Sequence, residues 1–145
     1  EWFLEKATEI GISEITPLIC RYSERNKFNY QRSIKILVSA MKQSMRYRLP
    51  IINYPENFKD YIISKNQDNI NSFIAICSDS NINLLKKKLI KGNDSQVMIG
   101  PEGGFSKTEI NLAKKAKFTT VSLGNNRLRT ETAGVVVCSI FKIIN

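Results

Sequence analysis

Two short segments of the chain place glycines and polar residues directly after apolar runs. In the first, the run Val97–Ile99 leads into Gly100, and Gly103 and Gly104 follow within the next four residues. Glycine lets the backbone approach a ligand closely, and a helix that begins beside it presents free N–H groups. The segment has neither the GK[ST] ending of a phosphate-binding loop nor a GxGxxG pattern. It predicts a ligand-binding turn, with a plain strand-to-helix turn as the alternative.

The second segment repeats this arrangement with cationic residues. Leu123 and Gly124 end an apolar run, and Arg127 and Arg129 lie in the polar stretch that follows. Both segments therefore leave the carboxyl ends of predicted strands. In α/β proteins this edge of the sheet is where ligands bind, so the two segments are the candidate site.

The residues after Arg129 have two explanations. Thr130 and Glu131 stand where a helix is expected to begin. Capping and the positive end of the helix dipole favour a hydroxyl and a carboxylate at such a place. The charged string is more than capping requires, which favours a role in the site.

A third segment closes the longest predicted helix with Arg46, Tyr47 and Arg48. Two arginines can hold phosphates while a tyrosine stacks on a base, which favours RNA binding. Cations at a helix C-terminus are also expected from the helix dipole alone. The residues by themselves leave both explanations open.

The amino-acid composition excludes several kinds of catalytic site. The chain has 145 residues and no histidine, which excludes a Ser-His-Asp triad, a Cys-His dyad and an HExxH zinc helix. We expect no metal. The net charge of +9 favours an anionic partner, most commonly a nucleic acid, although a solubilising surface is the simpler explanation.

The three cysteines are Cys20, Cys77 and Cys138, which are isolated and odd in number. They form neither a CxxC metal pattern nor an even disulfide set. We expect buried free thiols in a reducing cytosol, and therefore a cytoplasmic protein. No apolar run approaches the roughly 18 residues that a membrane helix needs.

Apolar periodicity predicts alternating helices and strands, and therefore an α/β domain with a largely parallel sheet. Gly11 is expected to cap the first helix, and Ser106 with Glu109 forms a capping box. The predicted helices cover residues 3–10, 34–45 (with Pro50 marking the end), 58–64, 81–90, 106–116 and 130–144. The predicted strands cover residues 12–20 (weakened by Pro17), 51–54, 73–77, 97–99 and 119–123.

Six strings occur in an order that resembles one family. They are EWFLEKATEIGI (1–12), ITPL (15–18), SER (23–25), Gln43-Ser44 with Arg46, IGPEGG (99–104) and LRTETA (128–133). Together they are similar to the bacterial 16S ribosomal RNA uridine-N3 methyltransferases, a branch of the SPOUT methyltransferases. The resemblance covers essentially the whole chain, and its last two strings are specific in combination.

The resemblance implies an α/β fold whose C-terminal segment threads a deep trefoil knot, an exception to unknotted topology. It implies S-adenosylmethionine as the cofactor, held bent within the knot. It also implies a homodimer with the site near the subunit interface, and 16S ribosomal RNA or the small ribosomal subunit as partner. The family's N-terminal PUA-like RNA-binding domain is not in this sequence, so we expect residues 1–145 to form the SPOUT methyltransferase domain.

Site residues follow by position from the resemblance. The cofactor-binding residues implied are Cys77, Ile99, Gly100, Gly104, Leu123, Gly124, Leu128 and Thr130, and the RNA-binding residues proposed are Arg25, Arg46 and Arg48. Contacts to adenine in such knots are largely to backbone groups. The chain departs from the family at Cys77-Ser78, where His-Pro is common. It departs again at Asn125–Arg127, where Pro-Arg and an apolar residue are common, and at Lys42 and Met45, where Glu and Gly are common.

Methylation of uracil N3 requires the proton on that nitrogen to leave. With no histidine, Arg129 is the preferred catalytic residue, because it can stabilise negative charge on the ring oxygens. Glu131 is either the base or a residue that orients Arg129. The alternatives are a knotted methyltransferase acting on transfer RNA and a non-catalytic RNA-binding module.

The last predicted helix carries more apolar surface than one small domain needs to cover. We expect part of it to bury in a homodimer, with an intramolecular core as the alternative. The residues concerned are Val136, Val137, Ile140, Phe141 and Ile144.

Overall fold

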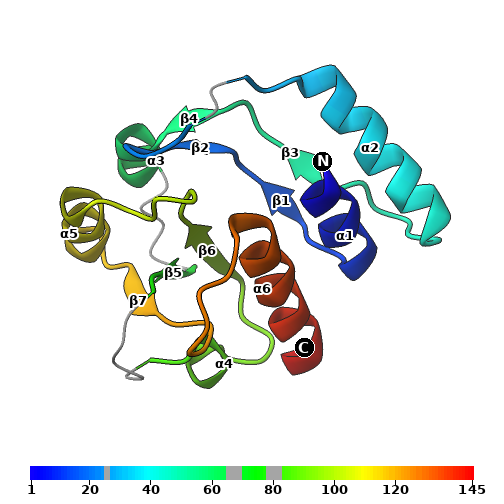
Figure 1. Cartoon of the computed structure of the whole chain (residues 1–145). Helices are drawn as coiled ribbons and strands as arrows, with labels where there is room; N and C mark the ends of the chain where they lie inside the picture. The colour runs from blue at the N-terminus through cyan, green and yellow to red at the C-terminus, as the bar shows by residue number, and fades with distance from the viewer. Residues whose placement is uncertain (25–26, 65–69, 78–82) are drawn as a thin grey trace.

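The structure is a computed structural model, and it describes residues 1–24, 27–64, 70–77 and 83–145. Its helices are α1 (Trp2–Ile10), α2 (Tyr30–Gln43), α3 (Phe58–Ser64), α4 (Leu85–Lys88), α5 (Lys107–Lys115) and α6 (Thr130–Ile144). Its strands are β1 (Glu14–Ile15), β2 (Leu18–Ile19), β3 (Ile51–Ile52), β4 (Glu56–Asn57), β5 (Asn71–Ala75), β6 (Ser95–Ile99) and β7 (Thr119–Val121). Every strand pair among the described residues is parallel, so the predicted α/β class is confirmed. Figure 1 shows helices on both sides of the strands, with α6 beside α1.

The three-stranded sheet positions the candidate site. Its order is β6-β5-β7, with β5 in the middle. Ala75 is paired with both Ile99 and Val121, so the three strands end side by side. The loops that follow these strands therefore start from one edge of the sheet.

The chain leaving β7 runs between two other segments. On one side, the Ile76 N–H donates to the Val121 carbonyl at 2.9 Å. On the other side, the Ser122 N–H donates to the Asn83 carbonyl at 2.8 Å, and the Leu85 N–H donates to the Ser122 carbonyl at 3.0 Å. Residues 121–122 are thus held by backbone hydrogen bonds from both flanks.

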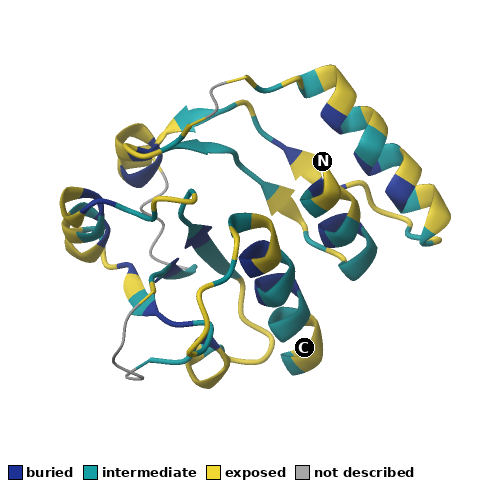
Figure 2. Cartoon of the chain, in the orientation of Figure 1, coloured by how far each residue is buried: buried dark blue, intermediate teal, exposed yellow. Residues whose placement is uncertain are grey.

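Helix α6 covers the sheet with its apolar face (Figure 2). Val137 is buried in a cluster with Phe73, Leu85 and Val121, and Ile140 and Phe141 pack against that cluster. Three of the five apolar residues considered for a dimer, Val137, Ile140 and Phe141, therefore contribute to the intramolecular core. This is the outcome that one amphipathic helix on a buried sheet favours.

Helices α1 and α6 approach closely because one residue has no side chain. A Cβ added at Gly134 would lie 2.4 Å from Cε2 of Phe3. The ring of Phe3 therefore occupies the space that a larger residue at position 134 would need. This contact joins the N-terminal helix to the helix that begins at the candidate site.

The predicted strand 12–20 is wrong as a single element. The structure divides it into β1 and β2, with Thr16 and Pro17 between them. Proline has no N–H to donate to a ladder, so it interrupts pairing at this point. The two halves pair with different partners, β1 with β3 and β2 with β4.

Helix α2 ends at Gln43, well before Pro50, which corrects the predicted extent. Met45 adopts a left-handed conformation (φ 52°), the Arg46 N–H donates to the Met41 carbonyl at 3.0 Å, and the Met45 N–H donates to the Lys42 carbonyl at 3.2 Å. This is the Schellman pattern, in which the left-handed position is usually glycine. The resembled family often has glycine at this position, and the backbone gives the physical reason.

The predicted helix 81–90 is also shorter, with only α4 formed among the described residues. Leu84 is extended (φ −65°, ψ 129°) and pairs with Ser122 instead. Sheet pairing of this backbone therefore competes with the helical pattern. Residues 81–82 of the predicted helix lie outside the described residues.

Candidate functional site

Two hydrogen bonds join the two candidate loops. The Thr130 hydroxyl donates from Oγ1 to the Gly100 carbonyl at 2.9 Å. Nη2 of Arg127 donates to the Glu102 carbonyl at 3.0 Å. The first residue of α6 is thus tied to the end of β6. The loops after β6 and β7 form a single unit, as their positions at strand ends predicted.

The loop after β6 depends on its glycines. Gly104 has φ 73°, and its N–H donates to the Pro101 carbonyl at 2.7 Å, which closes a tight turn. A Cβ at Gly100 would lie 3.2 Å from the Gly104 carbonyl carbon and 3.2 Å from the Phe105 nitrogen. A Cβ at Gly103 would lie 2.8 Å from Cβ of Tyr22. The loop is folded against itself and against the segment after β2.

A buried carboxylate anchors this loop at its far end. Glu109 is 8 % exposed, and its Oε2 accepts a hydrogen bond from the Ser106 N–H at 2.8 Å. Its Oε1 accepts from the Arg21 N–H at 2.8 Å. The predicted capping box is confirmed, since Oγ of Ser106 also accepts from the Glu109 N–H at 3.2 Å. The bond to Arg21 spans 88 positions and had no signal in the sequence.

The same carboxylate affects a neighbouring thiol. Burial, which is the larger cause, and the negative charge of Glu109 together raise the pKa of Cys20 to about 12. Burial also raises the pKa of Cys138 to about 11. Both thiols are free and buried, as predicted. Cys77 is exposed, which corrects the prediction that all three are buried. It lies just beyond β5 at the same sheet edge as the two loops.

Backbone donors are available at the strand ends. The N–H groups of Gly100, Leu123 and Leu128 form no hydrogen bond with another residue that the structure describes. Gly124 has φ 134°, and its N–H donates to Oγ of Ser122 at 3.2 Å, which shapes the turn. A planar heterocycle with acceptor nitrogens is a suitable ligand for backbone donors of this kind.

Arg129 and Glu131 stand at the start of α6 with exposed side chains. Arg129 is the N-cap residue and Glu131 lies in the first turn. Neither side chain forms a hydrogen bond or ion pair with any described residue, so Glu131 does not orient Arg129 in this structure. Both remain available to a substrate.

The three residues predicted to bind RNA have different positions. Arg46 is half-buried, and its guanidinium donates to the carbonyls of Glu9 (Nε, 2.8 Å) and Ile10, at the C-terminus of α1. Arg48 is exposed, and Arg25 lies outside the described residues. Arg46 therefore has a structural role in capping α1, which the sequence did not reveal, and its RNA contact stays a prediction.

Two features are absent from the described part of the chain. No group of three His, Cys, Asp or Glu residues there is arranged to hold a metal ion. None of its helices is long and apolar enough to cross a membrane.

Comparison with known families gives a match over almost the whole chain. The model of the RNA methyltransferase domain family matches residues 1–142. The Ribosomal RNA small subunit methyltransferase E of Rickettsia conorii is 31 % identical over 143 residues, covering 97 % of this chain and 58 % of that protein. The protein of the same name from Aquifex aeolicus is 34 % identical over 147 residues, covering 94 % of this chain and 59 % of that protein. The chain thus spans less than two thirds of the length of these relatives.

Solved structures agree with these relatives. A probable rRNA methyltransferase from Porphyromonas gingivalis superposes with a TM-score of 0.89 at 35 % identity, covering 99 % of this chain and 60 % of that one. A Ribosomal RNA small subunit methyltransferase E from Neisseria gonorrhoeae, bound to S-adenosyl methionine, superposes with a TM-score of 0.84 at 28 % identity, covering 98 % and 59 %.

Proposed function

This chain belongs to the RNA methyltransferase domain family, and from that premise we propose that it transfers a methyl group from S-adenosylmethionine to N3 of a uridine in 16S ribosomal RNA. The observation that carries the proposal is the joining of two strand-end loops by the hydrogen bond from Thr130 to Gly100. Relatives that are named small subunit rRNA methyltransferases support the substrate. The proposal assigns residues 1–145 to one methyltransferase domain.

The residues at the strand ends fit S-adenosylmethionine. The proposed cofactor site consists of Cys77, Ile99, Gly100, Gly104, Leu123, Gly124, Leu128 and Thr130. The N–H groups of Gly100, Leu123 and Leu128, which have no hydrogen-bond partner among the described residues, suit the ring nitrogens of an adenine. When bound, the cofactor supplies a methyl group on a positively charged sulfur. Cys77 offers a local readout, because bound cofactor should slow the reaction of its exposed thiol with a thiol reagent.

The path of the chain after β7 supports a trefoil knot. Residues 121–122 run between Ile76 on one side and residues 83–85 on the other, and the chain then returns to Gly100 through Thr130. A segment held from both flanks in this way is what threading through a loop requires. The described segments proposed to take part in the knot are Ile76, residues 83–85 and residues 121–130.

Arg129 and Glu131 carry the proposed chemistry. During transfer, the N3–H bond of uracil breaks, the N3–C bond to the methyl group forms, and the bond from that carbon to sulfur breaks. Negative charge that develops on the uracil oxygens is stabilised by the free guanidinium of Arg129 at the start of α6. Glu131 accepts the N3 proton. Positioning of the two bound reactants supplies much of the acceleration.

The proposed partners are 16S ribosomal RNA or the small ribosomal subunit and a second copy of the protein. Apolar residues of α6 that remain outside the core support a homodimer: Ile143 is 83 % exposed, and Val136 and Ile144 are half-buried. Sedimentation showing a dimer at micromolar concentration supports this, and a monomer rejects it.

Mass spectrometry of ribosomal RNA tests the function. RNA from cells that lack the gene should lose one methylated uridine from 16S ribosomal RNA, and the gene should restore it. A methyl group missing from transfer RNA instead would reassign the substrate. Unchanged methylation with intact RNA binding would favour a non-catalytic module.

A further inference from the structure

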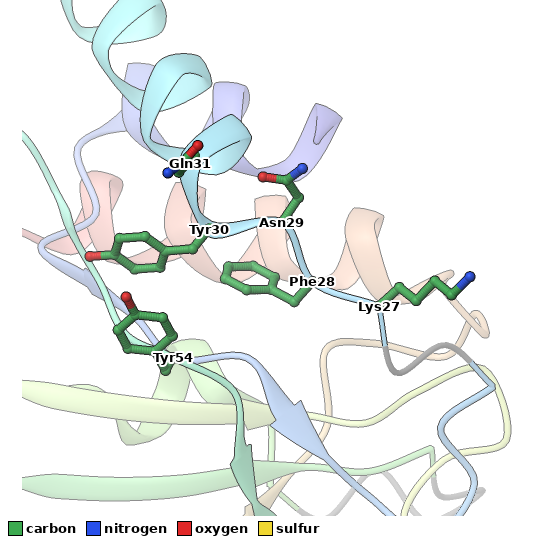
Figure 3. Close-up of a pocket in the computed structure, with 6 residues that line it drawn as sticks. All are labelled: Lys27, Phe28, Asn29, Tyr30, Gln31 and Tyr54. Carbon is green, nitrogen blue, oxygen red and sulfur yellow. The ribbon is translucent and has the colours of Figure 1, made fainter.

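A shallow pocket lies at the N-terminus of α2, away from the two loops just described. It encloses about 670 Å³ and is lined by Lys27, Phe28, Asn29, Tyr30, Gln31 and Tyr54. Figure 3 shows three aromatic rings gathered in it, with the Lys27 side chain pointing outward. None of the functions assigned above uses these residues.

The aromatic rings form a stack with one anchored end and one free end. Tyr30 and Tyr54 are stacked, with ring centroids 4.4 Å apart and planes 13° apart. Phe28 meets Tyr30 edge-on at 6.4 Å and 65°. Phe28 and Tyr30 pack against the buried cluster of Leu4, Leu37 and Ile52, whereas Tyr54 is 68 % exposed. Tyr54 thus presents a ring to solvent while Tyr30 holds its position.

The charge around the stack favours an anionic partner. None of the six lining residues is acidic, and Lys27 places an exposed cation beside the rings. Asn29 is occupied as the cap of α2, since its Oδ1 accepts from the Arg32 N–H at 3.0 Å. Aromatic rings beside a cation, on a protein of net charge +9, match the bases and phosphates of single-stranded nucleic acid. An apolar protein partner would provide no negative charge for the Lys27 side chain.

The pocket lies within reach of the proposed cofactor site. Tyr22 contacts the position of Gly103, because a Cβ there would approach Tyr22 to 2.8 Å. Lys27 follows Tyr22 by five residues, which limits the separation of their Cα atoms to about 18 Å even for an extended chain. One short stretch of single-stranded RNA can span both sites.

We propose that this aromatic pocket binds an unpaired base of the RNA substrate, stacked on Tyr54, with Lys27 contacting an adjacent phosphate. The proposal rests on the function proposed above, and it adds a binding site at a distance from the reacting nucleotide. Stacking is tolerant of base identity, so the pocket contributes affinity rather than sequence choice.

Fluorescence anisotropy of this chain with a labelled 12-nucleotide single-stranded RNA tests the pocket. Tyr54→Ala should weaken binding by about 5-fold to 150-fold, the range found for loss of one stacked base. Tyr54→Phe, which keeps the ring, should bind within about twofold of the unmodified chain. Ile63→Ala is the matched control, because Ile63 is 70 % exposed, about as much as Tyr54, and lies outside the pocket, and it should also bind normally. Lys27→Ala should reduce the slope of log affinity against log salt by about 0.7.

Three results would contradict the proposed role of the pocket: no RNA binding by the unmodified chain, equal losses for Tyr54→Ala and Ile63→Ala, or a Tyr54→Ala change in self-association alone. The last would make the surface a protein interface. Cofactor binding by the same variants separates this proposal from the proposed function. Tyr54→Ala should bind S-adenosylmethionine normally, so absence of cofactor binding by the unmodified chain counts against the function and not against the pocket.

Discussion

The strand-end loops and the aromatic pocket differ in the groups that they offer to a ligand. Around Gly100 and Thr130 the recognition groups are backbone N–H and carbonyl groups, held in place by glycines and by hydrogen bonds between loops. Around Tyr54 the recognition groups are side chains on an ordinary backbone. Changes in the loops should therefore act through shape and cofactor affinity. Changes in the pocket should act through RNA affinity alone.

The largest effect is expected where a side chain of the loop region meets the substrate. Arg129→Ala should lower the rate of methyl transfer by about 10²-fold to 10³-fold, because it removes a donor to charge that develops in the transition state. The affinity for S-adenosylmethionine should change little. Single-turnover methylation of small ribosomal subunits by the product of the complete gene measures the rate.

Lys91→Ala is the control for this variant, because it removes an equal charge from an exposed position outside both sites. If Arg129→Ala methylates at the unmodified rate with saturating RNA and cofactor, Arg129 is structural. Glu131 then becomes the leading catalytic candidate.

The second-largest effect is expected for Glu109, the carboxylate that anchors the loop after β6. Glu109→Ala should lower the free energy of unfolding by about 3 kcal/mol, because it removes a charged acceptor from the N–H groups of Ser106 and Arg21. Urea denaturation measures it. Glu131→Ala, which removes an exposed carboxylate, should change the stability by less than about 0.5 kcal/mol. Equal effects of the two variants would show that the loop does not depend on this anchor.

Removal of the hydrogen bond between the two loops should have a smaller effect. Thr130→Val keeps the shape of the side chain but removes the donor to Gly100, so cofactor affinity should fall by about threefold to tenfold. Equilibrium dialysis with labelled cofactor measures it. Thr132→Val changes an exposed residue of the same turn and should leave the affinity unaltered. A normal affinity for Thr130→Val would show that the two loops act independently.

The smallest effect is expected at the C-terminus of α2, the helix whose N-terminus borders the aromatic pocket. Met45→Gly should raise the free energy of unfolding by about 1 kcal/mol, because φ of 52° is strained for methionine and natural for glycine. Lys35→Gly, in the middle of α2, should lower the stability by about 1 kcal/mol instead. Thermal unfolding of both variants measures whether the stability rises in the first and falls in the second. A loss of stability in Met45→Gly would mean that the methionine side chain contributes packing despite its exposure.

Structural features that depend on residues adjacent in the chain could be predicted from the sequence. The cap of α1 at Gly11, the capping box at Ser106 and the start of α6 at Thr130 all have local signals, and all are confirmed. Strand ends and glycines also indicated the two candidate loops. These features follow from the conformational freedom and hydrogen bonding of a few adjacent residues.

Contacts between distant residues could not be predicted in this way. Nothing near Arg46 indicates that its guanidinium caps α1, and nothing near Glu109 indicates that it holds Arg21. The pairing of Leu84 with Ser122 shortens a helix whose local pattern is sound. The left-handed conformation of Met45 could not be predicted from its residue type, because methionine disfavours it, and the one signal was the glycine that the resembled family often has there.

Calorimetric titration of S-adenosylmethionine into this chain tests the central claim most directly. Because the proposed loops lie entirely within residues 77–132, the account predicts saturable binding of one cofactor per chain. Gly100→Val should abolish it, since even a Cβ at this position would crowd the backbone of Gly104 and Phe105. A folded chain that gives no binding heat, or a folded Gly100→Val variant that binds as tightly as the unmodified chain, would contradict the assignment of these loops.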